Sequence, residues 1–274
     1  MKKQVLLSID TASWTSASAG FRHPYPPTFP SGNLTVVDFF SSLLQLGTLT
    51  VPWRGAACSL AAYWAYVRYC AAVDLGEPYL RLVEEWSDLD PHQKTILSDD
   101  WGVGFTTHWL ASRLCFQSYC DGRYFIERLN GLGIATVNHR PEKRGPYKCP
   151  DFVFVDSNDR FHLVECKGTQ QGASYLQSQM SDGFAQKRSI VFSDEQGQVG
   201  QRLVAGFFAA ESTSNESSLL AVRDPEPDGK LIVKIREDAD PQMMRDVVRR
   251  GDLARQFQVM GGQLVAGELL AMPE

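Results

Sequence analysis

The sequence of 274 residues lacks several motifs that would identify a cofactor. It contains neither a GxxxxGK[ST] phosphate loop nor a GxGxxG fingerprint, so nothing in it indicates the use of ATP or a dinucleotide. Its six cysteines form no CxxC pair, which argues against a zinc ribbon or a thioredoxin-like site. Thiols scattered through a chain of this size are typical of the reducing cytoplasm, where we expect the protein to act.

Strong charge and long apolar runs are also missing. The formal net charge is −5, so any affinity for nucleic acid must come from local basic patches. The first apolar run stops at Asp10 and is too short for a secretory signal. The most membrane-like stretch, 56–73, contains Arg68 together with Tyr and Trp, which fits a packed helix better than a spanning one. We therefore expect no membrane anchor.

The chain divides by composition into three regions. Residues 1–97 are predicted to be a helix-rich N-terminal region of unknown role, and residues 98–211 an α/β core. Residues 212–274 begin with the low-complexity loop STSNESS and are predicted to be a C-terminal extension with a strand and helices. The elements expected outside the core lie at 34–50, 56–73, 79–89, 242–249 and 253–260 for helices and at 230–235 for the strand.

The core region combines helical and strand patterns. Asp99 and Asp100 precede an apolar stretch and are expected to cap its helix. In chain order we expect helices over 101–119 and 121–130, strands over 134–137, 152–155 and 161–165, a helix over 175–187 and a strand over 203–209. The order helix, three strands, helix, strand predicts an α/β fold.

The segment KCPDFVFVDSNDRFHLVECKGT holds two acids and a lysine in a pattern that suits phosphodiester chemistry. If the hairpin turn is centred on Asn158, Asp151 faces Glu165 across the two strands. Directly opposed residues have Cβ atoms about 4.5–5.5 Å apart, close enough for one metal ion to bridge two carboxylates. Because side chains alternate between faces, Lys167 shares the face of Glu165, and Cys166 belongs to the buried face. A register slip of one residue would break this arrangement.

These residues resemble the motif of the PD-(D/E)XK phosphodiesterases, a superfamily of restriction endonucleases, DNA-repair nucleases and Holliday-junction resolvases. The resemblance covers 98–210 and rests on Pro150-Asp151 and on Glu165-Cys166-Lys167. It implies a restriction-endonuclease-like αβββαβ core, with Asp151 and Glu165 as catalytic metal ligands and Lys167 as the catalytic lysine. It also implies Mg²⁺, replaceable by Mn²⁺, and hydrolysis of phosphodiester bonds, in the first place those of DNA. The implied setting is a microbial defence, restriction or mobile-element system.

Relatives often add an acidic metal ligand from the helix before the sheet, and two residues compete for that role. Glu127 lies on the helix that runs into 134–137, whereas Asp100 lies at the start of the earlier helix. The sequence slightly favours Glu127 and leaves both open, since either could equally be a solvated helix acid or a helix cap.

The loop 139–148 (HRPEKRGPYK) is the clearest candidate for a DNA contact. It leads directly into Asp151 and could reach the phosphates beside the scissile bond. Its basic residues are Arg140, Lys143, Arg144 and Lys148. The same loop could also be an ordinary solvated one.

Two other interpretations stay open. The hairpin could carry only surface charges, although this leaves the convergence of two acids and a lysine unexplained. Alternatively, the protein is a catalytically silent nuclease-fold module that binds DNA or scaffolds a larger complex. The modest net charge and the unexplained region 1–97 leave room for a partner protein or a second copy. A thiol nucleophile is disfavoured, because His162 and Cys166 lie about 13 Å apart along one strand.

Overall fold

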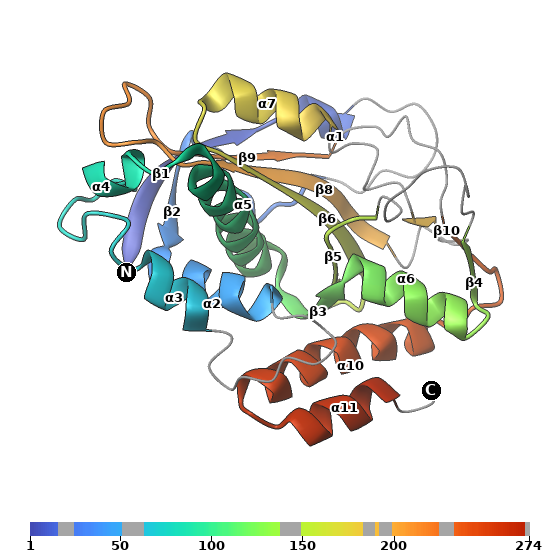
Figure 1. Cartoon of the computed structure of the whole chain (residues 1–274). Helices are drawn as coiled ribbons and strands as arrows, with labels where there is room; N and C mark the ends of the chain where they lie inside the picture. Colours follow the sequence, from blue (N-terminus) through green and yellow to red (C-terminus); the bar gives the residue numbers. More distant parts are fainter. Residues whose placement is uncertain are drawn as a thin grey trace.

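The computed structural model describes residues 1–15, 25–50, 63–137, 149–182, 190–191, 199–224 and 233–271 (Figure 1). A seven-stranded mixed sheet runs through the molecule in the order β2-β1-β9-β8-β6-β5-β3. Its strands are β1 (Lys2–Ile9), β2 (Leu34–Asp38), β3 (Phe116–Asp121), β5 (Phe152–Asp156), β6 (Phe161–Thr169), β8 (Val199–Phe208) and β9 (Leu219–Arg223). A small second sheet has the order β4-β10-β7, from β4 (Ala135–Val137), β10 (Val233–Ile235) and β7 (Ile190–Val191).

One face of the large sheet is covered by α5 (Pro91–Leu114) and α2 (Phe39–Leu49) (Figure 1). Aromatic rings fill this layer: Phe105 stacks on Phe207 with ring centroids 4.5 Å apart, and Phe39 meets Trp101 edge-on. Beside this layer lie three short helices, α1 (Ala12–Thr15), α3 (Trp64–Tyr69) and α4 (Glu84–Ser87). The aromatic content of the N-terminal third therefore builds the core under α5.

The opposite face carries two separate apolar clusters. Over β8 and β9, α7 (Ala173–Asp182) inserts Leu176 and Met180. Over β3 and β5, α6 (Gly122–Gly131) and α10 (Pro241–Val259) pack around a second cluster that includes Leu163. The last helix, α11 (Gln263–Ala271), packs on α10. Glu165 follows Leu163 on the same face, and its register partner Val204 belongs to the α7 cluster. The carboxyl group thus lies where the two apolar clusters meet.

Several predicted elements outside the hairpin are corrected by the structure. The stretch 34–50 begins with strand β2 before helix α2, because its β-branched residues alternate between buried and exposed positions. The helix expected over 79–89 is reduced to α4. The two helices expected over 242–249 and 253–260 are one continuous helix, α10. The helices α6 and α7 and the strands β4, β5, β6, β8 and β10 are confirmed where the structure describes them.

The main correction concerns the helix expected over 101–119. The helix α5 starts earlier, is capped by Asp90 rather than by Asp99 or Asp100, and ends at Leu114. Cys115 has φ +53°, a left-handed conformation that terminates helices. The chain then forms β3, which takes the place in the sheet that was expected for 134–137.

The three predicted regions are not separate units of the sheet. β1 and β2 from region 1–97 and β9 from region 212–274 lie in the same sheet as the core strands, and β9 joins β1 to β8. The N-terminal region is therefore not simply helical. Across the part of the chain that the structure describes, no helix is long and apolar enough to cross a bilayer.

Candidate active site

The β5–β6 hairpin has the register that the sequence predicted. Val153 pairs with Leu163 and Val155 with Phe161 in an antiparallel ladder. Continued by one step beyond Phe152 and Val164, this register places Asp151 opposite Glu165. β6 then runs on, parallel to β8, to Thr169. The two carboxyl groups thus lie at the open end of the hairpin, away from its turn.

Hydrogen bonds hold both the backbone and the side chain of Asp151. The amide of Gly122, at the start of α6, donates to the Asp151 carbonyl oxygen over 3.0 Å. A Cβ atom on Gly122 would lie 2.0 Å from the carbonyl oxygen of Pro150, so this approach requires glycine. The Asp151 side chain accepts a hydrogen bond from the Cys166 amide, with 2.8 Å between Oδ2 and N. The carboxyl group is therefore oriented by the strand that carries Glu165 and Lys167.

Glu165 is completely buried and only half satisfied. Its Oε1 atom lies 2.5 Å from Nζ of Lys167, in an ion pair whose lysine is partly exposed. Its Oε2 atom has no hydrogen-bond partner among the residues that the structure describes. A buried carboxylate oxygen without a donor is costly, so this arrangement suits a ligand that supplies positive charge.

The two carboxyl groups disfavour each other's ionisation. Burial raises the pKa of Glu165, and the nearby Asp151 carboxylate raises it further. Burial also raises the pKa of Asp151, against the effects of the Cys166 amide and of the Lys167 charge. The Glu165 carboxylate in turn holds the pKa of Lys167 above its ordinary value, although burial opposes this. One ammonium group therefore serves both the buried Glu165 and the half-buried Asp151.

The face assignment of the three consecutive residues is confirmed. Cys166 lies in the apolar layer under α5, where Thr106 Oγ1 donates to its Sγ atom over 3.4 Å. Burial raises the pKa of the Cys166 thiol, as expected of an unreactive cysteine. Glu165 and Lys167 point to the other face and meet each other. The alternation that the sequence predicted thus places the packed Cys166 on one face of the strand and the charged Glu165 and Lys167 on the other.

Neither predicted candidate for the additional acid joins this pair. Glu127 forms an ion pair with Arg123 on its own helix, with 2.8 Å between Oε1 and Nε. Asp100 accepts a hydrogen bond of 2.5 Å from the hydroxyl group of Tyr69. The carboxyl groups that raise the pKa of Asp151 are instead those of Asp121 and Asp99. Asp121 and Asp99 are therefore further candidates for the additional acid, and the preference for Glu127 stays a prediction.

Asp99 reaches the site because α5 and β6 cross at two glycines. A Cβ atom on Gly168 would lie 1.8 Å from the carbonyl oxygen of Ser98, and one on Gly102 would lie 2.6 Å from that of Lys167. This close approach brings the Asp99 carboxylate near enough to Lys167 for the two charges to interact. The sequence contained part of this signal, because Gly102 lies inside a predicted helix and Gly168 follows a predicted strand, positions where glycine can mark a close backbone approach. It did not show that these two glycines face each other.

The predicted DNA-contact residues Arg140, Lys143, Arg144 and Lys148 lie outside the described residues. The arginines of α10 have partners within the protein: Arg249 contacts Asp159 over 3.0 Å. Arg255 is buried and donates to the carbonyl oxygen of Leu49 at the end of α2. The described part of α10 thus supports the fold rather than a basic surface.

A metal ion was expected from the resemblance, and the residues present can be tested for it. Within the described residues, no three His, Cys, Asp or Glu side chains form a ready set of ligands. The donors that converge are carboxylate oxygens, which prefer hard ions such as Mg²⁺ or Mn²⁺. The unpaired Oε2 atom of Glu165 and the raised pKa values of both acids are what a divalent cation would relieve. The residues fit such an ion.

Comparison of the chain with protein-family models, with curated proteins and with solved structures found no match.

Proposed function

We propose that the protein is a nuclease that requires a divalent metal ion and hydrolyses phosphodiester bonds, in the first place those of DNA. The observation that carries this proposal is the pair of the half-buried Asp151 and the buried Glu165, which shares a single ammonium group and leaves Glu165 Oε2 without a donor among the described residues. A structural carboxylate is normally satisfied by its own protein. This pair is organised for a charged ligand.

The surroundings of the pair support a kinship with the PD-(D/E)XK nucleases. Helix α5 is followed by the antiparallel strands β3, β5 and β6, then by helix α7 and by β8, which runs parallel to β6. That is an αβββαβ order when α6 and the second-sheet strands β4 and β7 are taken as insertions. The helices α5 and α7 cover opposite faces of the sheet, as the two clusters of buried residues indicate (Figure 1).

The side chains have distinct tasks in this proposal. A divalent cation held by Asp151 and Glu165 would offset phosphate charge and lower the pKa of a water molecule. The amide of Cys166 holds Asp151 Oδ2, which fixes the direction in which the carboxylate faces. Lys167 Nζ now donates to Glu165 and would turn to a phosphate oxygen or to the attacking water when substrate is present.

Contacts further from the scissile bond belong to the same proposal. Asp99 would tune the charge of Lys167 and the cation affinity of Asp151. The basic residues of 139–148 would bind flanking phosphates. A role in microbial defence, restriction or mobile-element biology would agree with such an activity.

The proposal is tested by incubating the purified full chain with supercoiled DNA, linear DNA and RNA in Mg²⁺, Mn²⁺ or EDTA. We expect cleavage of DNA that requires the metal ion. The matched control is the double variant Asp151→Asn with Glu165→Gln, which keeps the shape of both side chains and removes their charge. Binding of DNA without cleavage by the unaltered protein in either metal would instead support the silent nuclease-fold module.

A further inference from the structure

The two edges of the large sheet, β3 and β2, differ in what lies against them. Helix α10 lies against the β3 edge: a Cβ atom on Gly251 would be 2.8 Å from that of Cys120. The adjacent Asp252 is also close enough to raise the pKa of Tyr119, which lies on the opposite face from Cys120. At the other edge, β2 pairs with β1 and with no other described strand. One edge is covered by a helix, and the other, which we call the open edge, has no further partner strand among the described residues.

The open edge carries backbone groups that point away from β1 and have no partner among the residues that the structure describes. In the β1–β2 ladder, the amide and carbonyl groups of Thr35 and Val37 point toward β1. The hydrogen bond from Leu7 N to Asn33 O over 2.8 Å establishes this, because every second residue of β2 bonds to β1. The amide and carbonyl groups of Leu34 and Val36 therefore point outward. They make no hydrogen bond with any residue that the structure describes. This is the pattern that accepts a further strand.

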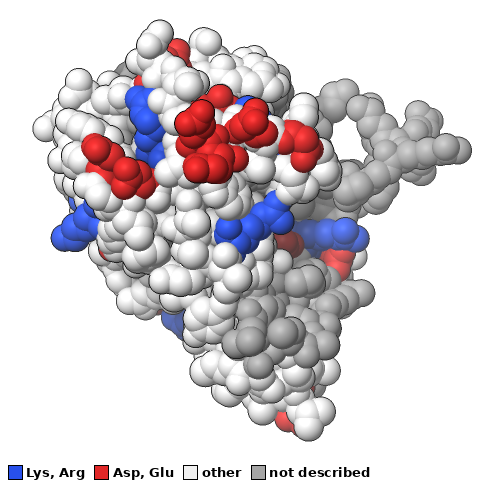
Figure 2. All heavy atoms as spheres, turned by 60° about the vertical axis from the view of Figure 1, so that its left-hand side comes forward, with Lys and Arg blue, Asp and Glu red and all other residues white. Residues whose placement is uncertain are grey.

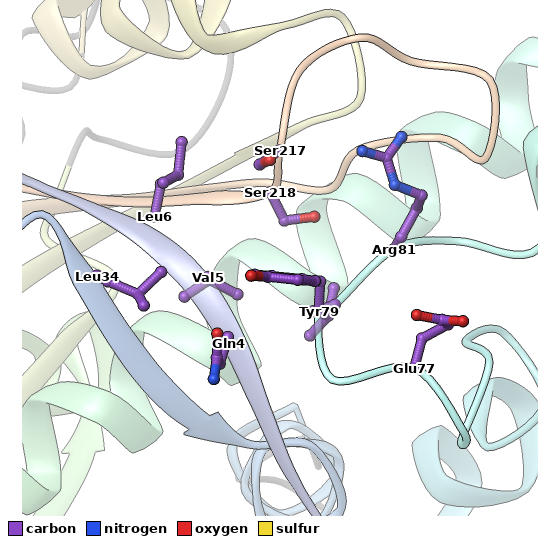
Figure 3. A pocket seen from close by; sticks show the side chains of 10 residues that line it. Gln4, Val5, Leu6, Leu34, Glu77, Tyr79, Arg81, Ser217 and Ser218 are labelled. Carbon is purple, nitrogen blue, oxygen red and sulfur yellow. The ribbon is translucent and has the colours of Figure 1, made fainter.

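The side chains of the same two residues are apolar and exposed. Leu34 is 45% exposed and Val36 46%, and Leu6 lies opposite Leu34 on the same face. A hollow of about 260 Å³ lies beside Leu34 and Leu6, and Tyr79 also lines it (Figure 3). Sheet edges that avoid pairing are usually protected by lysine, proline or a bulge. The strand sequence LTVVD has none of these.

The charge around this edge disfavours a nucleic acid as its occupant. Figure 2 shows acidic side chains gathered on this side of the molecule. Glu84 and Glu85 on α4 and Glu216 in the loop before β9 are exposed acids. The centre of the edge, formed by Leu34 and Val36, is uncharged. An apolar strand fits it better than a phosphate backbone does.

We propose that two copies of this chain associate by pairing their β2 strands antiparallel, which joins the two sheets into one. A two-fold axis at Val36 would place this residue opposite its counterpart in the second copy, and Leu34 opposite the second copy's Asp38. An antiparallel edge is complementary to itself under this symmetry, because the outward amide and carbonyl group of Val36 meet those of the second copy's Val36. The exposed leucine and valine side chains of both copies would then cover one another.

The proposed contact leaves both candidate active sites complete. β6 is separated from β2 by β8, β9 and β1, so nine strand spacings would separate the two sites, about 40 Å at 4.8 Å each. Each site uses residues of one chain alone. Loss of the dimer should therefore leave the cleavage rate per chain unchanged, and the proposal stands or falls independently of nuclease activity.

The test is sedimentation velocity of the full chain between about 1 and 100 μM, since a short strand pair is a small interface of micromolar affinity. We expect a species of twice the 30.6 kDa chain mass. Val36→Pro removes an outward amide but no bond to β1, so the fold should survive and the dimer dissociation constant rise at least tenfold. Val36→Lys should act in the same direction by charge, and circular dichroism verifies that both variants are folded.

The matched control is Leu264→Lys on α11, where the native leucine is 85% exposed. This variant should dimerise like the unaltered protein. The proposal is overturned if the unaltered chain is a monomer at 100 μM, or if a dimer persists unchanged in both Val36 variants. A dimer that is lost only in Leu264→Lys would also overturn it, and would place the contact on α11.

Discussion

The β5–β6 hairpin carries a buried carboxylate cluster at each end, and the two clusters differ in how well they are satisfied. At the turn, the Asp156 carboxylate accepts hydrogen bonds from the amides of Asn158 and Arg160, from the Arg160 guanidinium and from His162. At the open end, Asp151 and Glu165 share one lysine, and Glu165 Oε2 has no partner in the described structure.

In the turn cluster, the hydrogen bonds also define which ring nitrogen of His162 carries the proton. His162 Nδ1 accepts from the amide of Gln201 over 3.0 Å, so the ring proton is on Nε2 and is donated to Asp156 over 3.0 Å. Burial lowers the pKa of His162, which keeps the ring neutral. A Cβ atom on Gly200 would lie 2.3 Å from His162 Cε1, so the strand beside it also needs glycine.

On the proposed function, the difference separates a structural carboxylate from a metal-binding one. Hydrogen bonds from His162 and from the Arg160 and Asn158 amides lower the pKa of Asp156, although burial opposes them. At the other end, burial outweighs the few available donors and raises the pKa of Asp151 and Glu165. Burial alone therefore does not mark a site. A carboxylate marks one when its own protein leaves it incompletely neutralised.

The largest effect is expected from Glu165→Gln. Cleavage should fall by about 10³-fold or more, because a metal-binding charge is lost. The unfolding free energy of the metal-free protein should rise at pH 8, since the variant no longer buries a poorly satisfied carboxylate. Single-turnover cleavage and denaturant unfolding in EDTA measure the two quantities. A variant that cleaves at the normal rate would refute the assignment of Glu165.

Asp156→Ala should give the opposite result at the turn. Removal of the carboxylate leaves several buried donors without an acceptor, and we expect a loss of about 3 kcal/mol of unfolding free energy. Below its lowered melting temperature, the variant should still cleave within a few-fold of the normal rate. Urea unfolding and a cleavage assay at low temperature check this. Cleavage lost as severely as in Glu165→Gln would erase the distinction between the two clusters.

Lys167→Ala should reduce the cleavage rate by about 10²-fold while Mn²⁺ binding survives, because both carboxylates remain. Lys167→Arg should rescue poorly, since a planar guanidinium does not replace a compact ammonium group. The matched control is Cys166→Ala, which should cost stability and spare the chemistry. Single-turnover rates and calorimetric Mn²⁺ titrations distinguish these variants. Normal cleavage by Lys167→Ala together with a dead Cys166→Ala would invert the assigned faces.

The pH dependence of stability should have opposite signs at the two ends. The raised pKa of Glu165 contributes stability that is complete below its unfolded value of about 4.3 and is lost as the pH rises through the folded value. The lowered pKa of Asp156 contributes stability above about 3.9 that is lost on acidification. Thermal melts of metal-free protein from pH 3 to 9 should show Glu165→Gln losing the alkaline decline and Asp156→Asn losing part of the acid decline.

The smallest effect is expected from the acids around the site. Asp99→Asn should change the cleavage rate by about tenfold and weaken Mn²⁺ binding, because its charge interacts with Lys167 and Asp151. Glu127→Gln is the matched control and should leave both quantities unchanged. Asp100→Asn should lower stability through its bond to Tyr69. A larger loss of Mn²⁺ affinity in Glu127→Gln than in Asp99→Asn would restore the original preference for Glu127.

The hairpin could be predicted in detail because its information is local. Alternating apolar residues, a turn of five polar residues and the period of two fix the pairs Val153–Leu163 and Val155–Phe161. The same alternation separates Cys166 from Glu165 and Lys167. Local patterns were insufficient where a segment is apolar on both faces or short. β2 and β3 were expected to be helical for that reason, since periodicity distinguishes poorly between a buried strand and a buried helix.

The sequence by itself thus determined the chemistry of the hairpin: which residues carry carboxyl and amine groups, and which face each one shares. Only the tertiary structure decided which charges are satisfied. The Gly102–Gly168 crossing that brings in Asp99, the strand β8 that gives His162 its amide partner, and the union of β1, β2 and β9 with the core all join residues far apart in the chain. The physical reason is that satisfaction of a buried charge depends on every neighbour in space, and the sequence specifies only the neighbours along the chain.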